Sequence, residues 1–189
     1  MTLGDLVARM TDSLDKAGIP FMVTGSLASS FHGEPRTTRD VDLVIDPTDR
    51  ALRSFLDSLP AEEFYRDADA ARAALAERGQ FNVVEIATGW KVDLVMRKDR
   101  PFSQEEFGRR LRVELFGRES FIATAEDTII AKLEWAQAGE SERQLRDVAS
   151  IVAVSGDGLD RAYLDRWIRA LGLEALWDRA RSSVHMGGQ

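Results

Sequence analysis

The chain of 189 residues has no cysteine and only two histidines. It therefore has no disulfide and no thiolate nucleophile, and neither residue type supplies enough ligands for a zinc site. It also lacks a run of about 18 uncharged apolar residues, the length that a membrane span needs. Its first residues lack the basic and apolar regions of a secretory signal. We therefore expect a cytoplasmic protein with no membrane partner.

Net positive charge is missing as well. Against 25 lysines and arginines stand 32 aspartates and glutamates, which gives a formal charge of -7. Such a balance excludes a protein that coats nucleic acid by bulk electrostatics, although a local basic groove stays compatible with it. Glycine-rich phosphate loops of the Walker A type, dinucleotide fingerprints and the Gly-x-Ser-x-Gly elbow of hydrolases are absent too.

What the sequence does contain is a pattern of helices and strands that changes along the chain. Up to residue 123 the apolar spacing predicts mixed helix and strand, and from Thr124, a candidate N-cap, it predicts helices. We expect an α+β fold: a sheet-bearing catalytic domain over 1–123, a C-terminal helical subdomain over 124–183, and a disordered tail over 184–189. The expected strands are 20–23, 40–46, 81–87, 90–96, 111–116 and 120–123, with a further short one within 62–78.

Three aspartates stand inside two apolar strands, where aspartate is uncommon. The strand period of two puts Asp40 and Asp42 on one face, about 6 to 7 Å apart, and puts Asp93 on the corresponding face of 90–96. If the strands are neighbours, the three carboxylates converge and need a cation. Mg²⁺ suits such oxygen ligands, and two ions can stabilise the attacking and leaving oxygens of a displacement at phosphorus. The alternative is that each strand has a solvated face and the acids are exposed surface.

A Gly-Ser pair, Gly25-Ser26, stands where the strand 20–23 turns into a helix. Glycine allows the backbone to approach a ligand, and the N-H groups of a helix start, with the Ser26 hydroxyl, suit a triphosphate. Alone, such a pair is more often an ordinary N-cap. Followed by Asp-x-Asp and a later third aspartate, it indicates a nucleotide site.

In these residues the chain resembles the nucleotidyltransferase superfamily with the DNA polymerase beta-like fold. The resemblance is carried by Gly25-Ser26, by the run from Arg36 to Leu43, and by Lys91-Val92-Asp93-Leu94-Val95. Within the superfamily the chain looks most like the AbiEii-like group, which includes toxins of type IV toxin-antitoxin systems. Later segments, 126–135 and 143–148, are similar to that group as well.

The resemblance implies a magnesium-dependent enzyme that moves an NMP from an NTP to a hydroxyl acceptor and releases pyrophosphate. It implies that Asp40, Asp42 and Asp93 are catalytic and hold the metal, two Mg²⁺ ions, and that Asp93 activates the acceptor hydroxyl. It assigns nucleotide binding to Gly25, Ser26 and Lys132; we add Arg39, which flanks the metal strand. Asp127 and Asp147 would support the site. From the residues alone, Lys132 is equally a solvated helix lysine, and Arg146 and Asp147 are equally a surface charge cluster.

The acceptor is the open part of this interpretation. A locally basic stretch lies in an otherwise acidic chain and suits either a groove for an RNA end, such as tRNA, or a solvated surface. Its members are Arg97, Lys98, Arg100, Arg109, Arg110 and Arg112. We expect an RNA or protein acceptor and, for a toxin, a cognate antitoxin. The alternatives are a small-molecule adenylyltransferase of the antibiotic type and a non-catalytic nucleotide-binding module. His32 is either a substrate contact or an ordinary loop histidine.

Overall fold

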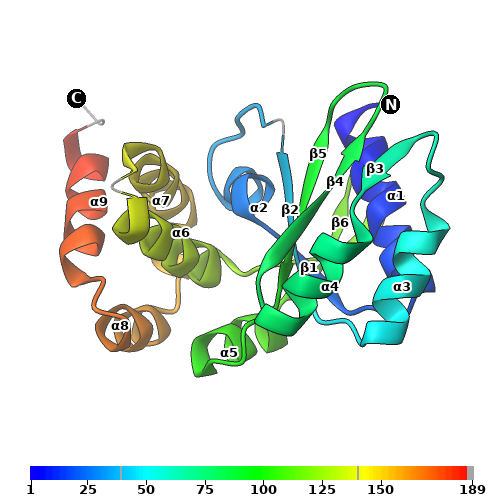
Figure 1. The fold of residues 1–189 in the computed structure, drawn as a ribbon. Helices are drawn as coiled ribbons and strands as arrows, with labels where there is room; N and C mark the ends of the chain where they lie inside the picture. Colours follow the sequence, from blue (N-terminus) through cyan, green and yellow to red (C-terminus); the bar gives the residue numbers. More distant parts are fainter. Residues whose placement is uncertain (39, 140, 187–189) are drawn as a thin grey trace. The chain divides into compact units, whose positions relative to one another are not determined.

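A computed structural model of the chain describes residues 1–38, 40–139 and 141–186. The fold is α+β with a seven-stranded mixed sheet, as the sequence pattern predicts (Figure 1). The strands are β1 (Phe21–Thr24), β2 (Asp40–Ile45), β3 (Phe64–Arg66), β4 (Gln80–Glu85), β5 (Lys91–Met96), β6 (Leu111–Leu115) and β7 (Arg118–Ile122). The α-helices are α1 (Leu3–Lys16), α2 (Gly25–His32), α3 (Asp49–Ser58), α4 (Ala68–Glu77), α5 (Pro101–Arg109), α6 (Ala125–Gly139), α7 (Glu142–Ser155), α8 (Arg161–Ala170) and α9 (Glu174–Met186).

The chain forms two compact units. The first comprises Met1–Ser26 and Thr38–Ile122 and contains the whole sheet, and the second comprises Leu27–Thr37 and Ala123–Gln189. The sequence pattern predicts residues 27–37 within the domain 1–123, whereas in the structure they group with the C-terminal helices. Their apolar spacing predicts a helix there but carries no information about which neighbours that helix packs against.

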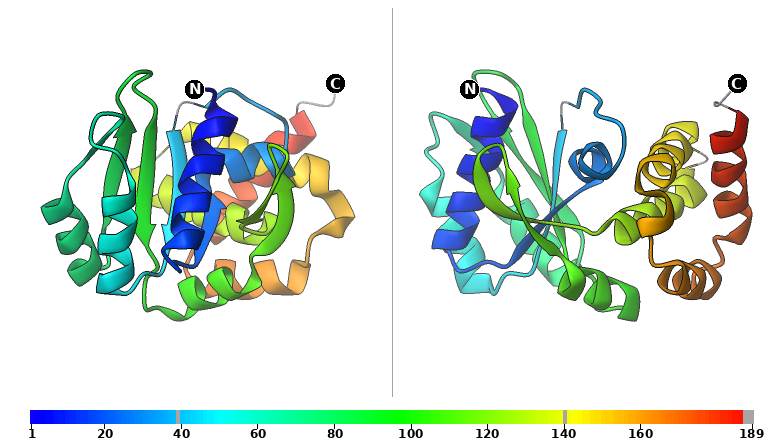
Figure 2. Two further views of the ribbon diagram at one scale, coloured as in Figure 1. Left: turned by 90° about the vertical axis from the view of Figure 1, so that its right-hand side faces the viewer. Right: turned by 180° about the vertical axis from the view of Figure 1, so that it is seen from behind.

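The sheet unit is built around the strand order β3-β4-β5-β2-β1-β7-β6. Strand β2 runs parallel to β5 and antiparallel to β1, so it is a central strand with a partner on both sides. Helices α1 and α3 lie on one side of the sheet, and α4 packs against both β4 and α3 (Figure 2). Side chains on this side, including Val41, Leu43 and Phe55, are completely buried. One face of the sheet is thereby fixed as core.

Local signals set the ends of the first helix. Thr2 caps α1 through a hydrogen bond from the Asp5 N-H to its hydroxyl, and the Asp5 carboxylate accepts one from the Thr2 N-H in return. This reciprocal pair satisfies backbone donors that a helix start leaves open. The helix ends before Gly18, as its position in the sequence predicts. Residues Leu6, Met10 and Leu14 then share one fully buried face.

The helical unit is assembled on α6 and α7, which pack against each other. Helix α9 packs against α7, and α8 packs against α6. The fully buried residues of this core are Ile129, Ile130, Leu133, Val148 and Ile151. Helix α9 continues to Met186, so residues 184–186 of the expected tail are helical, and 187–189 lie outside the described residues. In the part of the chain that is described, no helix is long and apolar enough to cross a membrane.

Candidate active site

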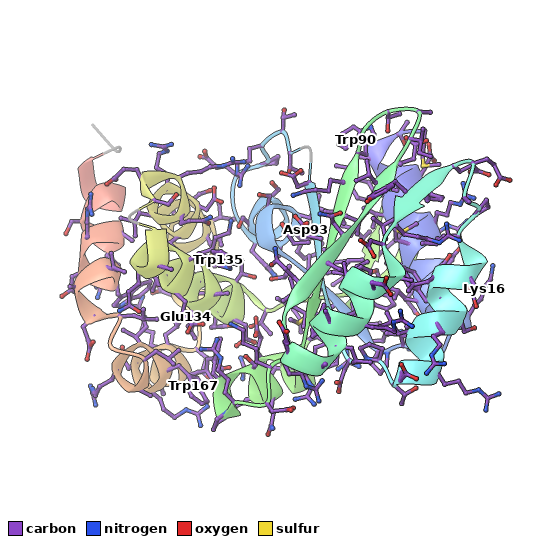
Figure 3. All side chains as sticks on the ribbon, in the orientation of Figure 1. Lys16, Trp90, Asp93, Glu134, Trp135 and Trp167 are labelled. Atoms are coloured by element: carbon purple, nitrogen blue, oxygen red, sulfur yellow. The ribbon has the colours of Figure 1, made fainter. Side chains whose placement is uncertain are left out.

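The alternation of β2 and β5 places the predicted carboxylates on the face of the sheet opposite the core. Val41, Leu43 and Ile45 are fully buried, while Asp42 is half-buried and Asp40 is exposed. In β5 the same alternation leaves Asp93 half-buried, with a side chain 16% exposed. Figure 3 labels Asp93 on this face, away from α1 and α3. We call the face that carries Asp40, Asp42, Lys91 and Asp93 the carboxylate face.

Strand pairing brings the aspartates of the two strands together. In the parallel register of β2 and β5, Asp42 is the direct partner of Asp93, and Asp40 is the partner of Lys91. Neighbouring strands lie about 4.8 Å apart, so the Asp42 and Asp93 side chains start from adjacent positions on one face. The predicted juxtaposition of the two strands is therefore confirmed. The row of direct partners continues to Thr24 on β1 and to Asn82 on β4.

Gly25 follows β1 immediately and passes against Asp42. Its φ of +62° is the left-handed conformation that favours glycine. A Cβ atom at this position would lie 2.0 Å from Oδ2 of Asp42 and 2.5 Å from its Cγ. No side chain fits there without displacing the carboxylate. The Gly-Ser turn and the Asp-x-Asp strand, separate in the sequence, thus lie against each other in the structure.

Lys91 also lies on the carboxylate face, and the sequence-based predictions give it no role. Its Nζ lies 2.8 Å from Oδ2 of Asp93. The hydrogen bond to Asp93 and the negative charges of Asp93, Asp40 and Asp42 raise the pKa of Lys91, although its partial burial opposes the shift. All three predicted aspartates thus act on one ammonium group. A signal for Lys91 exists in the sequence, because residues two apart on a strand share a face.

The carboxylate face has ligand groups that suit Mg²⁺ but does not provide a complete set of protein ligands. Paired carboxylates on adjacent strands are the oxygen ligands that Mg²⁺ uses, with waters and substrate phosphates completing its shell. Among the described residues, however, no three histidine, aspartate or glutamate side chains are grouped so that they could hold a metal ion. Asp42 and Asp93 fit the ion by position, and Asp40 stands two residues away in the register. The metal site accordingly stays a prediction.

The other predicted nucleotide-binding residues are distributed over both units. Ser26 is half-buried in the first turn of α2, where N-H groups at a helix start favour anions. Arg39 lies outside the described residues. Lys132 belongs to α6 in the helical unit and is only 5% exposed. Its interpretation as a solvated lysine is therefore wrong.

Lys132 takes part in a buried ion cluster with Arg36 and Asp147, all three in the helical unit. Lys132 Nζ lies 2.7 Å from Oδ2 of Asp147. Arg36 donates from Nε to Oδ1 at 2.9 Å and from Nη2 to Oδ2 at 2.8 Å, a two-pronged contact. Burial alone would raise the pKa of Asp147, but the hydrogen bonds from Arg36 and Lys132 outweigh it and lower the pKa below 3.8.

Asp147 and Arg146, adjacent in the sequence, have different surroundings. Asp147 is 6% exposed, whereas Arg146 is exposed. The alternative that both form a surface charge cluster is thus wrong for Asp147. Asp147 instead joins α7 to α6 and to the segment 27–37 through its two cationic partners.

Asp127 is a structural anchor of the helical unit. It is fully buried and accepts hydrogen bonds from the Thr124 hydroxyl at 2.7 Å and the Tyr163 hydroxyl at 2.5 Å. Its own N-H donates to the Thr124 hydroxyl at 3.0 Å, so the predicted N-cap at Thr124 is confirmed. Through Tyr163 the same carboxylate fastens α8 to α6.

The basic stretch is largely engaged in contacts inside the sheet unit. Arg97 donates to Asp46 at 2.9 Å, and Arg112 pairs with Glu119. The Arg110 guanidinium lies over the rings of Phe107 and Phe121. These three residues thus have structural partners and offer no support for a nucleic-acid groove.

His32 has the contacts of a structural histidine. Its Nε2 lies 2.7 Å from the carbonyl oxygen of Ala123, within the helical unit. Burial lowers the pKa of His32, against the smaller opposing effects of that carbonyl and of Glu126. The alternative of an ordinary loop histidine is the one that these contacts favour.

Comparison with known proteins shows which proteins share this fold. No family model matches the sequence, and no curated protein matches it either. The structure does match an antigenic nucleotidyltransferase-like protein from Paracoccidioides brasiliensis, with a TM-score of 0.57 and 18% sequence identity over 95% of this chain and 92% of that one. The chain therefore has the fold of nucleotidyltransferase-like proteins.

Two further solved structures match with lower scores. The antibiotic-resistance factor ANT(2'')-Ia has a TM-score of 0.49 and 13% identity, over 97% of this chain and 93% of that one. JHP933 from Helicobacter pylori has a TM-score of 0.44 and 16% identity, over 97% and 92% of the two chains. The fold assignment rests on the match to the Paracoccidioides protein.

Proposed function

We propose that the chain is a nucleotidyltransferase that moves an NMP from an NTP to a hydroxyl acceptor and releases pyrophosphate. The observation that carries the proposal is the register of Asp42 with Asp93 beside a glycine turn that leaves no room for a side chain. The fold that the chain shares with nucleotidyltransferase-like proteins supports it.

The roles of the residues follow from their chemistry. Asp42 and Asp93, with Asp40, would hold Mg²⁺, which when bound supplies positive charge to the phosphate oxygens. The Gly25 turn and the start of α2 would receive the triphosphate. A carboxylate of Asp93 would accept the proton of the acceptor hydroxyl as its oxygen attacks the α-phosphorus. The bond from that phosphorus to the bridging oxygen breaks, and pyrophosphate leaves with both electrons.

The proposal also extends to the acceptor of the NMP. A toxin-like enzyme acting on RNA, such as tRNA, or on protein, with a cognate antitoxin, rests on the resemblance of the run from Arg36 to Leu43 and of segments 126–135 and 143–148 to the AbiEii-like group. Nucleotide binding by Lys132 rests on the resemblance to the superfamily, and nucleotide binding by Arg39 rests on its position beside the metal strand. Because Lys132 is held by Asp147, its contribution to nucleotide binding would require that ion pair to be shared with a phosphate.

The test is transfer of label from each α-labelled NTP in the presence of Mg²⁺. Parallel reactions receive total RNA, cell protein or a mixture of aminoglycosides, so the labelled fraction identifies the acceptor class. We expect Asp42→Asn to reduce transfer by at least about 100-fold, because it removes a charged group of the reaction centre. Asp57→Asn, at an exposed position of α3, is the matched control. Absence of metal-dependent transfer with every NTP and acceptor would contradict the proposal.

A further inference from the structure

Lys91 occupies a defined place on the carboxylate face. It is the first residue of β5, shares its face with Asp93 two residues later, and is in register with Asp40 on β2. Its Nζ lies 2.8 Å from Asp93 Oδ2, and its side chain is 39% exposed. The ammonium group is therefore anchored at one end of the face and still reaches solvent.

The charges around Lys91 explain why a cation stands there. Asp42 and Asp93 start from directly opposed positions on adjacent strands, and Asp40 follows at the next position on the same face. Negative charges at such short separation repel one another. Asp93 is largely covered, and a covered carboxylate is costly without a cationic or hydrogen-bonding partner. Lys91 supplies such a partner within the chain itself.

We propose that Lys91 is the built-in counter-ion of the carboxylate face and that its ion pair with Asp93 excludes a divalent ion from the same carboxylate oxygen. This inference rests on the proposed function. A metal ion that binds Asp93 through Oδ2 competes with Nζ for that oxygen, because two cations at such short separation repel each other. Lys91 is a positioning residue in this scheme: it acts on Asp93 and takes no part in the transfer.

Two consequences follow for the free protein. Lys91 offsets part of the negative charge of the carboxylate face without metal, so the sheet unit folds in the absence of the ion. A divalent ion alone binds weakly, since it competes with an ammonium group that the chain holds at high local concentration. An ion that arrives with a nucleotide brings further phosphate ligands, which offset the cost of displacing Lys91.

The experiment measures Mn²⁺ binding without nucleotide, by electron paramagnetic resonance of free Mn²⁺, for the full chain and its variants. We expect Lys91→Met, which keeps most of the length of the side chain but removes the charge, to bind Mn²⁺ at least about tenfold more tightly. Lys91→Arg keeps the charge and should bind like the wild type. Lys98→Met, an exposed lysine just beyond β5, controls for the loss of one positive charge.

Thermal unfolding provides a second measurement that does not depend on activity. In EDTA, Lys91→Met should unfold at a lower temperature than wild type, and Mn²⁺ should raise its midpoint more than that of wild type. Equal Mn²⁺ affinity and equal response of the two proteins would overturn the counter-ion assignment while leaving the proposed transferase intact. If neither protein binds Mn²⁺, with or without an NTP, the proposed function itself fails.

Discussion

A Cβ atom on Gly25 would lie 2.0 Å from Oδ2 of Asp42, so the turn after β1 packs against the Asp42 side chain with no space for a further atom. The backbone at Gly25 also has a φ of +62°. Two independent penalties thus oppose any other residue at this position: strain in the left-handed conformation and a collision with the carboxylate.

Gly25→Ala tests this relationship. We expect it to destabilise the protein by more than about 2 kcal/mol in urea unfolding, because the strain of a positive φ and the collision add. Gly89→Ala is the matched control, since Gly89 has a φ of +72° but open space around it. That variant should lose only about 1 kcal/mol from the conformational strain. Equal losses for the two variants would show that Asp42 does not restrict the turn.

Asp147→Asn tests the buried ion cluster. Removing the carboxylate leaves Lys132 and Arg36 without this buried partner, and we expect a loss of about 3 kcal/mol at pH 7. Because the pKa of Asp147 in the folded chain is lowered below 3.8, the stabilisation from its charge is present above that pH and is lost as the pH falls through the folded value. Urea unfolding at pH 7 and pH 3 measures the difference.

The gap between wild type and Asp147→Asn should therefore be wide at pH 7 and narrower at pH 3. Asp57→Asn, which removes an exposed carboxylate, should follow the wild type closely at both values. A gap that is the same at both pH values would mean that the charge of Asp147 contributes nothing to stability.

Tyr163→Phe removes the hydrogen bond from the Tyr163 hydroxyl to the buried Asp127 carboxylate. We expect a loss of about 2 kcal/mol in urea unfolding, because hydrogen bonds to charged groups contribute more than neutral ones. Tyr65→Phe serves for comparison, since Tyr65 is 59% exposed on β3. It should change stability by less than about 0.5 kcal/mol. If the two phenylalanine variants behave alike, Asp127 does not depend on Tyr163.

His32 makes stability depend on pH in a second range. Burial lowers the pKa of His32 below 6.5, so the folded state favours the neutral ring. The stabilisation that comes from keeping the His32 ring neutral is fully present above about pH 6.5. It is lost as the pH falls toward the lower pKa that His32 has in the folded state. His32→Gln should reduce the decline in stability between pH 7.5 and pH 5. An unchanged decline in that variant would assign the effect to other groups.

The sequence was sufficient for most of the fold because its patterns are local. Alternating apolar residues predict β2 and β5, and the helical spacing before Gly18 predicts α1. The convergence of the two aspartate strands followed from the same alternation together with the resemblance. Local patterns of this kind do not identify the metal, the acceptor or membership of the AbiEii-like group. These three stay predictions.

The features that the sequence did not disclose depend on contacts between distant residues. Arg36 and Asp147 are 111 positions apart, and nothing in the local spacing of either residue indicates the other. The basic stretch shows the same limit, because clustering in sequence did not show that Arg97 and Arg112 have acidic partners. Lys91 is different, because the sequence shows that it shares a strand face with Asp93. Its proposed role as a counter-ion, however, depends on the register of β5 with β2.

The division of the chain into units limits how the protein can be cut. The chain passes from one unit to the other after Ser26, after Thr37 and after Ile122. A fragment that begins at Ala123 would include Lys132 and Asp147 but would lack Arg36 and the segment that His32 fastens to Ala123. The helical unit is thus not a module that can be detached by truncation at one point, and gene fusions or split versions of this protein must keep residues 27–37 with the C-terminal part.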